Sequence, residues 1–138
     1  MNLKRWVLAT VGAFAAIFAA EYFIHHAWLS DFYQSHAQWW RPEAEMQSLL
    51  PFLFLGQLSL AALLTLVYAK GYQKGKGRIA QGFRFGVLIG LLLFFPHSLM
   101  SYCIYPYPMS LILSWFIGGL IELALAGMVI GYFYRPTK

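Results

Sequence analysis

The sequence predicts an all-α integral membrane protein: a four-helix bundle that forms a single transmembrane domain over residues 1–138. Its 138 residues are 60% hydrophobic and only 11% charged, whereas a soluble domain carries roughly 25% charged residues. Four apolar segments, at residues 6–29, 48–69, 79–102 and 109–134, are each long enough to cross a ~30 Å hydrocarbon core. Because backbone amides in hydrocarbon need internal partners and four segments cannot close a barrel, we predict that all four are helices.

The distribution of basic residues predicts the orientation of these helices. If the N-terminus is cytoplasmic, nine of the ten lysines and arginines face the cytoplasm and only Arg41 lies outside. This asymmetry predicts a multi-pass protein of a bacterial cytoplasmic membrane, with both termini in the cytoplasm and the lipid bilayer as its partner. It also accounts for the net charge of +5, so we expect no nucleic-acid partner. The nine residues are Lys4, Arg5, Lys70, Lys74, Lys76, Arg78, Arg84, Arg135 and Lys138.

The connection after the first helix carries Phe32, His36 and Trp39 at helical spacing. Aromatic side chains concentrate at the headgroup level of membranes, so we predict a short interfacial helix on the outer surface between the first two spans. Pro42 should end this helix, because the residue before a proline avoids helical geometry. Pro42 then suits the first position of the second spanning helix, and Pro51 is expected to kink that helix.

Small residues predict how the helices pack. The third helix carries glycine at residues 82, 86 and 90, and the fourth carries Gly118, Gly119, Gly127 and Gly131. Such residues let helix backbones approach closely, which drives helix association in lipid. Because the turn at residues 71–77 is short and glycine-rich, we expect the second and third helices to be antiparallel neighbours. The same small residues would also serve contacts between protomers.

Two carboxylates, Glu21 and Glu122, lie within the predicted spans. An ionisable group at such a depth costs about 2.5–3.5 kcal/mol or more, so it normally faces the bundle interior and has a partner. His25 follows Glu21 by four residues, which places imidazole and carboxylate on one helical face. His97 is expected to continue the glycine face of the third helix at a similar depth. We therefore predict a cluster of Glu21, His25 and His97 in the outer half of the bundle, with Glu122 one or two turns deeper.

This cluster has three interpretations. The first is a hydrogen-bonded pair that holds two helices together. The second is a site for protons or for the headgroup of a quinone or lipid. The third is a transition-metal or haem site. His25 and His97 are the candidate metal ligands, because imidazole binds several such metals. The sequence favours the absence of a cofactor, because the chain has neither an HxxxH pair nor a CxxCH sequence.

Several stretches resemble a family of small four-span bacterial membrane proteins of uncharacterised function. They are Trp40–Met46 (WRPEAEM), Phe83–Gly90 (FRFGVLIG, an FGxxxG block), Tyr105–Ser110, Trp115–Glu122 and Tyr134–Pro136. The resemblance implies a four-span fold and no mechanism. Within the first stretch, Trp40, Arg41, Glu43 and Glu45 are expected to form a charged lid over the outer helix ends.

The chain has no nucleophile–base pair and no nucleotide-binding motif, so the sequence favours a protein without catalytic residues. Its small size favours an accessory or scaffold subunit of a larger membrane complex, or a homo-oligomer. Two alternatives follow from the predicted cluster. One is a small transporter or proton-linked channel with an outer-leaflet Glu/His site, and the other is a membrane metal- or haem-binding protein.

Overall fold

The computed structural model describes residues 2–134, so Arg135 and Lys138 of the predicted cytoplasmic set lie outside the described residues. Within this range there is no strand, and four helical segments are long and apolar enough to cross a membrane. They are Leu3–Trp28, formed by α1 (Leu3–Tyr22) and the π-helix η1 (Phe23–Trp28), then α4 (Leu50–Gly71), α5 (Arg78–Ile104) and α6 (Met109–Phe133). Each overlaps a predicted span, with ends that differ by a few residues.

The connection between the first two spans consists of three short helices: α2 (Ser30–Ser35), the 3-10 helix η2 (Ala37–Trp39) and α3 (Glu43–Ser48). The expected continuous second helix with a kink at Pro51 is wrong. The helix ends at Ser48, and α4 restarts at Leu50 with Pro51 in its first turn. Proline has no N–H and its ring would collide with the carbonyl four residues earlier, so the helix breaks ahead of it.

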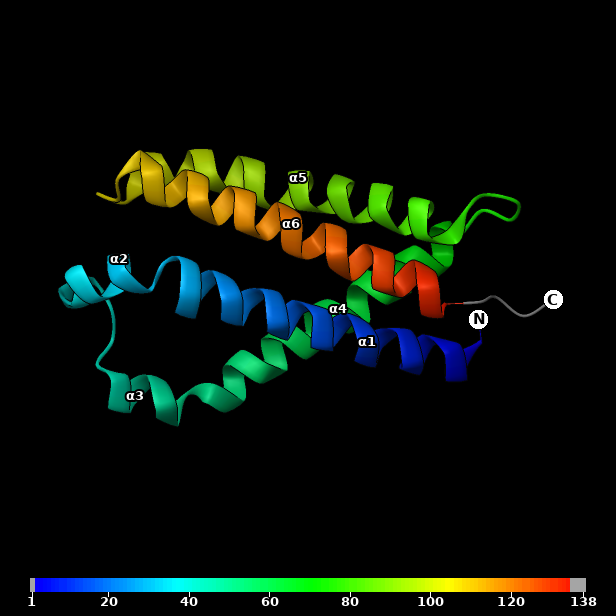
Figure 1. The fold of residues 1–138 in the computed structure, drawn as a ribbon, viewed down its shortest axis with the longest axis horizontal. Coiled ribbons are helices and arrows are strands. Elements are labelled where there is room, and N and C mark those ends of the chain that lie inside the picture. The colour runs from blue at the N-terminus through cyan, green and yellow to red at the C-terminus, as the bar shows by residue number, and fades with distance from the viewer. Residues whose placement is uncertain (1, 135–138) are drawn as a thin grey trace.

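The helices pack in the order α4, α1, α6, α5, with α6 between α1 and α5 (Figure 1). One end of the molecule, here called the turn end, holds the start of α1 and the turn at residues 72–77. The opposite end, called the α2 end, holds α2, η2, α3 and the α5–α6 connection. The expectation that α4 and α5 are neighbours is wrong over most of their length. They meet near their turn, where the Tyr68 hydroxyl donates to the Arg78 carbonyl at 3.2 Å and the Tyr68 ring packs on Phe85.

Glycines explain why α5 chooses α6 as its partner. A Cβ atom on Gly82 would overlap the Gly127 carbonyl, and one on Gly86 would overlap the Leu123 carbonyl. The two backbones are therefore in direct contact, as expected for helices that associate through small residues. The glycine face of α5 is fully used in this contact and is not available to α4.

The main core lies between α1, α4 and α6 toward the turn end, and it contains small and branched apolar residues together with Tyr68. A smaller cluster at the α2 end contains Ile24, Leu29 and Leu111, surrounded by aromatic side chains. The first turns of α4, residues 50–56, are exposed throughout. The four-helix arrangement is thus open at the α2 end, where α4 diverges from α5.

Candidate functional site

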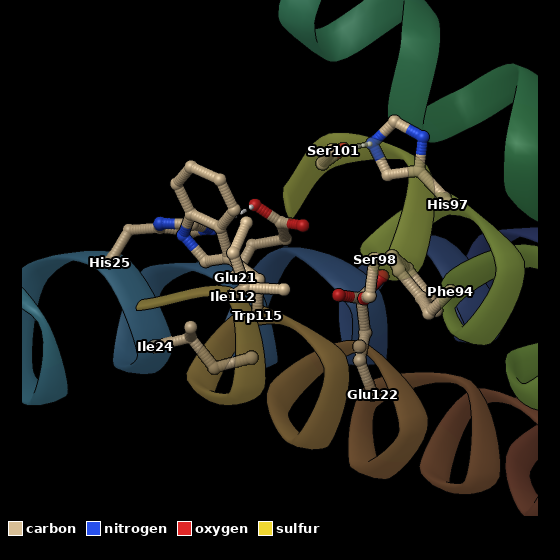
Figure 2. Close-up of a pocket in the computed structure, with 11 residues that line it drawn as sticks. Glu21, Ile24, His25, Phe94, His97, Ser98, Ser101, Ile112, Trp115 and Glu122 are labelled. Carbon is tan, nitrogen blue, oxygen red and sulfur yellow. Dashed lines mark hydrogen bonds and ion pairs between the residues drawn. The ribbon is translucent and has the colours of Figure 1, made fainter. Parts of the chain in front are cut away.

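A cavity of about 210 Å³ lies between α1–η1, α5 and α6 in the half of the molecule nearer the α2 end. Figure 2 shows Glu21 and His25 on one side of it, Glu122 rising from α6, and His97 with Ser101 on α5. None of the described lining residues comes from α4. The cavity is lined by Glu21, Ile24, His25, Phe94, His97, Ser98, Ser101, Ile112, Trp115, Gly119 and Glu122.

Glu122 is the most deeply placed charged residue of the cavity, with 2% of its surface exposed. It follows Gly118 and Gly119 on the buried face of α6. These glycines give Ile24 and Phe94 room to pack against the α6 backbone, since a Cβ on Gly118 would lie 3.0 Å from Ile24 Cδ1. Glu122 is therefore held at the back of the cavity by the close packing of α1 and α5 on α6.

The carboxyl groups of Glu21 and Glu122 line the same cavity, one from α1 and the other from α6 (Figure 2). A carboxylate only accepts hydrogen bonds, so two carboxyl groups can bond to each other only when one of them carries a proton. No lysine or arginine lines the described part of the cavity. The pair is thus a place where the chain can hold a proton between two helices.

Glu21 is also joined to His25, as predicted from their spacing. Nε2 of His25 lies 3.3 Å from the Glu21 carboxylate, and both side chains are 35% exposed. His25 belongs to the π-helix, whose wider turn is closed by the bond from the Leu29 N–H to the Ile24 carbonyl, 2.9 Å long. The imidazole therefore lies between the surface of the chain and the Glu21 carboxylate.

The other nitrogen of His25 bonds to Tyr33, a residue that follows the π-helix. The Tyr33 hydroxyl lies 2.6 Å from Nδ1 of His25 and accepts a hydrogen bond from the Trp115 indole at 2.8 Å. Nε2 of His25 faces the Glu21 carboxylate, which only accepts hydrogen bonds, so Nδ1 of the neutral ring accepts the hydroxyl proton of Tyr33. Neutral His25 then carries its proton on Nε2 and donates it to Glu21. The result is a directional chain from Trp115 through Tyr33 and His25 to the carboxyl pair.

Tyr33 lies outside the spanning helices and is half-buried. Burial raises the pKa of its hydroxyl, the Trp115 N–H opposes that shift, and the negative charge of Glu21 adds to it. The hydroxyl therefore keeps the proton that orients His25.

His97 lines the cavity, but the expectation that it faces a packed helix interface is wrong. It is exposed, and its polar contact is with Ser101, whose Oγ lies 3.3 Å from Nε2. The glycine face of α5 continues instead through the half-buried Phe94 and Ser98 to the buried Ser101. His97 is one position, or about 100° of helical rotation, away from that face. The structure thus joins Glu21, His25 and Glu122 closely, with His97 at the rim.

The four residues of the predicted lid do not line the cavity. Trp40 packs on the small apolar cluster beside Tyr107 and Trp115. Arg41 is exposed and pairs with Glu45 four residues later, and Glu43 is exposed as well. Of the four predicted lid residues, Trp40 therefore packs against the fold, whereas Arg41, Glu43 and Glu45 are exposed charged side chains.

The geometry gives little support to a metal or haem site at His25 and His97. Both ring nitrogens of His25 already have partners, Tyr33 and Glu21. Among residues 2–134, no group of three or more histidine, cysteine, aspartate or glutamate side chains is arranged to hold a metal ion. Metal binding would require the hydrogen-bond chain to open first.

Sequence reasoning missed the aromatic members of the site. Tyr33 lies eight residues after His25, a spacing that an unbroken α-helix does not bring into contact, and Trp115 resembles an ordinary interfacial aromatic residue. Ser101 was detectable, because it follows His97 by four residues on one helix. The π-helix and the break at Leu29 separate α1 from α2, and no local pattern in this sequence marks either of them.

Comparisons of the chain with protein families, with curated proteins and with solved structures found no match. The resemblance to a family of four-span bacterial proteins therefore stays a prediction.

Proposed function

We infer that this chain is a small multi-pass membrane protein that binds and releases protons at the Glu21–Glu122 pair, as a proton-linked transporter or channel. The observation that carries this proposal is the placement of two carboxyl groups, one of them 2% exposed, in one cavity without lysine or arginine among its described lining residues. Two ionised carboxylates in such surroundings would repel each other and lack hydration. A proton shared by the pair removes both costs.

Glu21 connects the pair to the surface of the chain. Its side chain is 35% exposed, and His25 donates a hydrogen bond to its carboxylate. Tyr33 and Trp115 fix the nitrogen of His25 that faces Glu21. In this proposal a proton binds first at Glu21 and then passes to Glu122, which is buried on α6.

The charges of the chain support an orientation for this process. Lys4, Arg5 and the basic residues at 70–84 gather at the turn end, whereas Asp31, Glu43 and Glu45 lie at the α2 end. Under the positive-inside rule the turn end is cytoplasmic and both termini are inside a bacterial cytoplasmic membrane. The aromatic helices α2 and η2 then lie on the outer surface, and the cavity opens in the outer leaflet.

Proton flux through liposomes tests this function. The purified chain is reconstituted with a pH-sensitive dye inside, and a potassium diffusion potential drives proton entry. Glu122→Gln should abolish the flux, because an amide has the same shape but cannot exchange a proton. Glu45→Gln, which removes an exposed carboxylate outside the cavity, should leave it unchanged. Equal flux through both variants, with equal far-UV circular dichroism, would reject the proposal.

A second proposal, an accessory subunit or homo-oligomer, is favoured by a different observation. Residues 50–56 of α4 are apolar or small, and all of them are exposed. They lie outside the main core, on the side where the helix arrangement is open. A helix from another chain placed there would complete the four-helix arrangement around the cavity. Purification in mild detergent followed by mass measurement tests this, and a monomer without any co-purified chain would count against it.

A further inference from the structure

A second cavity, of about 520 Å³, lies at the turn end, far from the carboxyl pair. The turn after α4 contributes Gln73 and Lys76, and the first turns of α5 contribute Gln81, Arg84 and Leu88. We propose that this cavity binds the phosphate group of an anionic phospholipid, with Lys76 and Arg84 as its charged ligands. The proposal does not depend on proton transfer at the other cavity.

The cations of this region have no ion-pair partner among the described residues. Residues 46–121 contain no aspartate or glutamate, although Lys70, Lys74, Lys76, Arg78 and Arg84 lie among them. The ion pairs among residues 2–134 are Glu21–His25 and Arg41–Glu45, and neither involves these cations. Residues 2–134 thus supply no anion to these cations, and the anionic headgroups of a membrane would.

The two cavity cations suit a phosphate group in particular. A guanidinium presents a planar fork of donors that matches two phosphate oxygens, and an ammonium supplies a compact positive charge beside it. Gln73 and Gln81 add amide groups that donate hydrogen bonds. α5 begins at Arg78 without a side-chain cap, so backbone N–H groups of its first turn add partial positive charge on the same side.

The surface below the cations favours a phospholipid over a free phosphate ion or an acidic peptide. Leu88 lines the cavity four residues after Arg84, and Leu92 follows after four more, so the three share one helical face. Leu88 is 64% exposed and Leu92 is 65% exposed. The stripe from Arg84 to Leu92 runs about 12 Å along the helix axis. A phospholipid alone among these ligands has both a phosphate for the cations and an acyl chain for the stripe.

Lipid retention by the purified full chain tests the proposal. The chain in neutral detergent is mixed with phosphatidylglycerol and phosphatidylcholine of identical acyl chains, and native mass spectrometry measures which lipid stays bound. Inorganic phosphate is tested separately by broadening of its phosphorus resonance. The test variant is Lys76→Gln with Arg84→Gln. The matched control is Lys70→Gln with Lys74→Gln, which removes the same charge from the same end at residues that do not line the cavity.

We expect a preference of about tenfold or more for phosphatidylglycerol. Phosphatidylcholine carries the same phosphate, but its choline ammonium cancels the negative charge and is repelled by Lys76 and Arg84. The Lys76/Arg84 variant should lose this preference, and the Lys70/Lys74 control should keep it. Saturable binding of inorganic phosphate that is lost in the same variant would instead show a free-phosphate site and overturn the phospholipid assignment. Equal retention of both lipids, or equal loss in both double variants, would overturn the site itself. Glu122→Gln should retain phosphatidylglycerol normally, which separates this result from the flux experiment.

Discussion

The hydroxyl of Tyr33 lies 2.6 Å from Nδ1 of His25, and it reaches this nitrogen across a π-turn from a separate short helix. The Trp115 indole bonds to the same hydroxyl from α6. Tyr33 and the Glu21 carboxylate together determine which nitrogen of His25 carries the proton. This arrangement joins α2, η1 and α6 into one hydrogen-bonded unit at the α2 end.

Replacing Tyr33 by phenylalanine should destabilise the protein by about 1–3 kcal/mol. The change removes the bond to His25 and leaves the half-buried Trp115 N–H without an acceptor. Thermal unfolding in detergent measures the loss, and nitrogen NMR of His25 should show both neutral tautomers in place of one. Tyr102→Phe is the control, because Tyr102 is exposed near the end of α5. Equal stability of the two variants would contradict the assigned bond.

Alkaline pH should weaken the same contact. Because burial raises the pKa of Tyr33 in the folded protein, its contribution to stability is complete below the unfolded value of about 10 and is lost as pH rises through the folded pKa. The difference in unfolding free energy between the natural chain and Tyr33→Phe should therefore shrink above about pH 10. A difference that stays constant through this range would contradict the prediction.

Gly86→Ala should separate α5 from α6. The added methyl group would overlap the backbone carbonyl of Leu123, and backbone cannot rotate away as a side chain can. Overpacking of this kind costs about 1–3 kcal/mol, and occasionally more. Gly56→Ala is the matched control, since a Cβ there meets nothing within 4 Å, and alanine favours helix more than glycine does. Unfolding by denaturing detergent should show that Gly86→Ala is much less stable than the natural chain. Gly56→Ala should be as stable as the natural chain or more stable.

Cys103 offers a test of the proposed orientation. It is the chain's single cysteine, it is exposed, and it lies one residue before the end of α5 at the α2 end. A membrane-impermeant maleimide applied to intact spheroplasts should label it. A Cys103→Ser chain that also carries Lys74→Cys in the opposite turn should be labelled only after the membrane is opened. The reverse pattern would place the turn end outside.

The spanning helices were predictable because their signal is simple. Long apolar segments with few charges have one solution in a bilayer, and all four appear as helices. The break before Pro51 was harder to predict, because a proline in the first turn of a new helix and a proline that kinks a continuous helix leave similar sequences. The separation of α4 from α5 could not be predicted either. A short turn holds two helices together only at the turn and does not determine the angle between them.

The candidate site was predictable in part, for the same kind of reason. The spacing of Glu21 and His25 fixes their contact, and the cost of burying Glu122 in a membrane indicates that it needs a partner. His97 was misplaced because a shift of one residue rotates a helical position by about 100°. Tyr33 could not be found, since it lies beyond the break at Leu29, which no local pattern in this sequence marks.

The π-helix at Phe23–Trp28 sets how the site responds to a change in chain length. A π-turn is equivalent to an α-helix with one residue inserted. Deleting a single residue there, such as the exposed Ala27, would remove the bulge and leave the residues after it close to their present orientation. Tyr33 would then still face His25. A deletion in the regular turns of α1 has no bulge to absorb it, so it would rotate the preceding part of the helix by about 100° relative to the site.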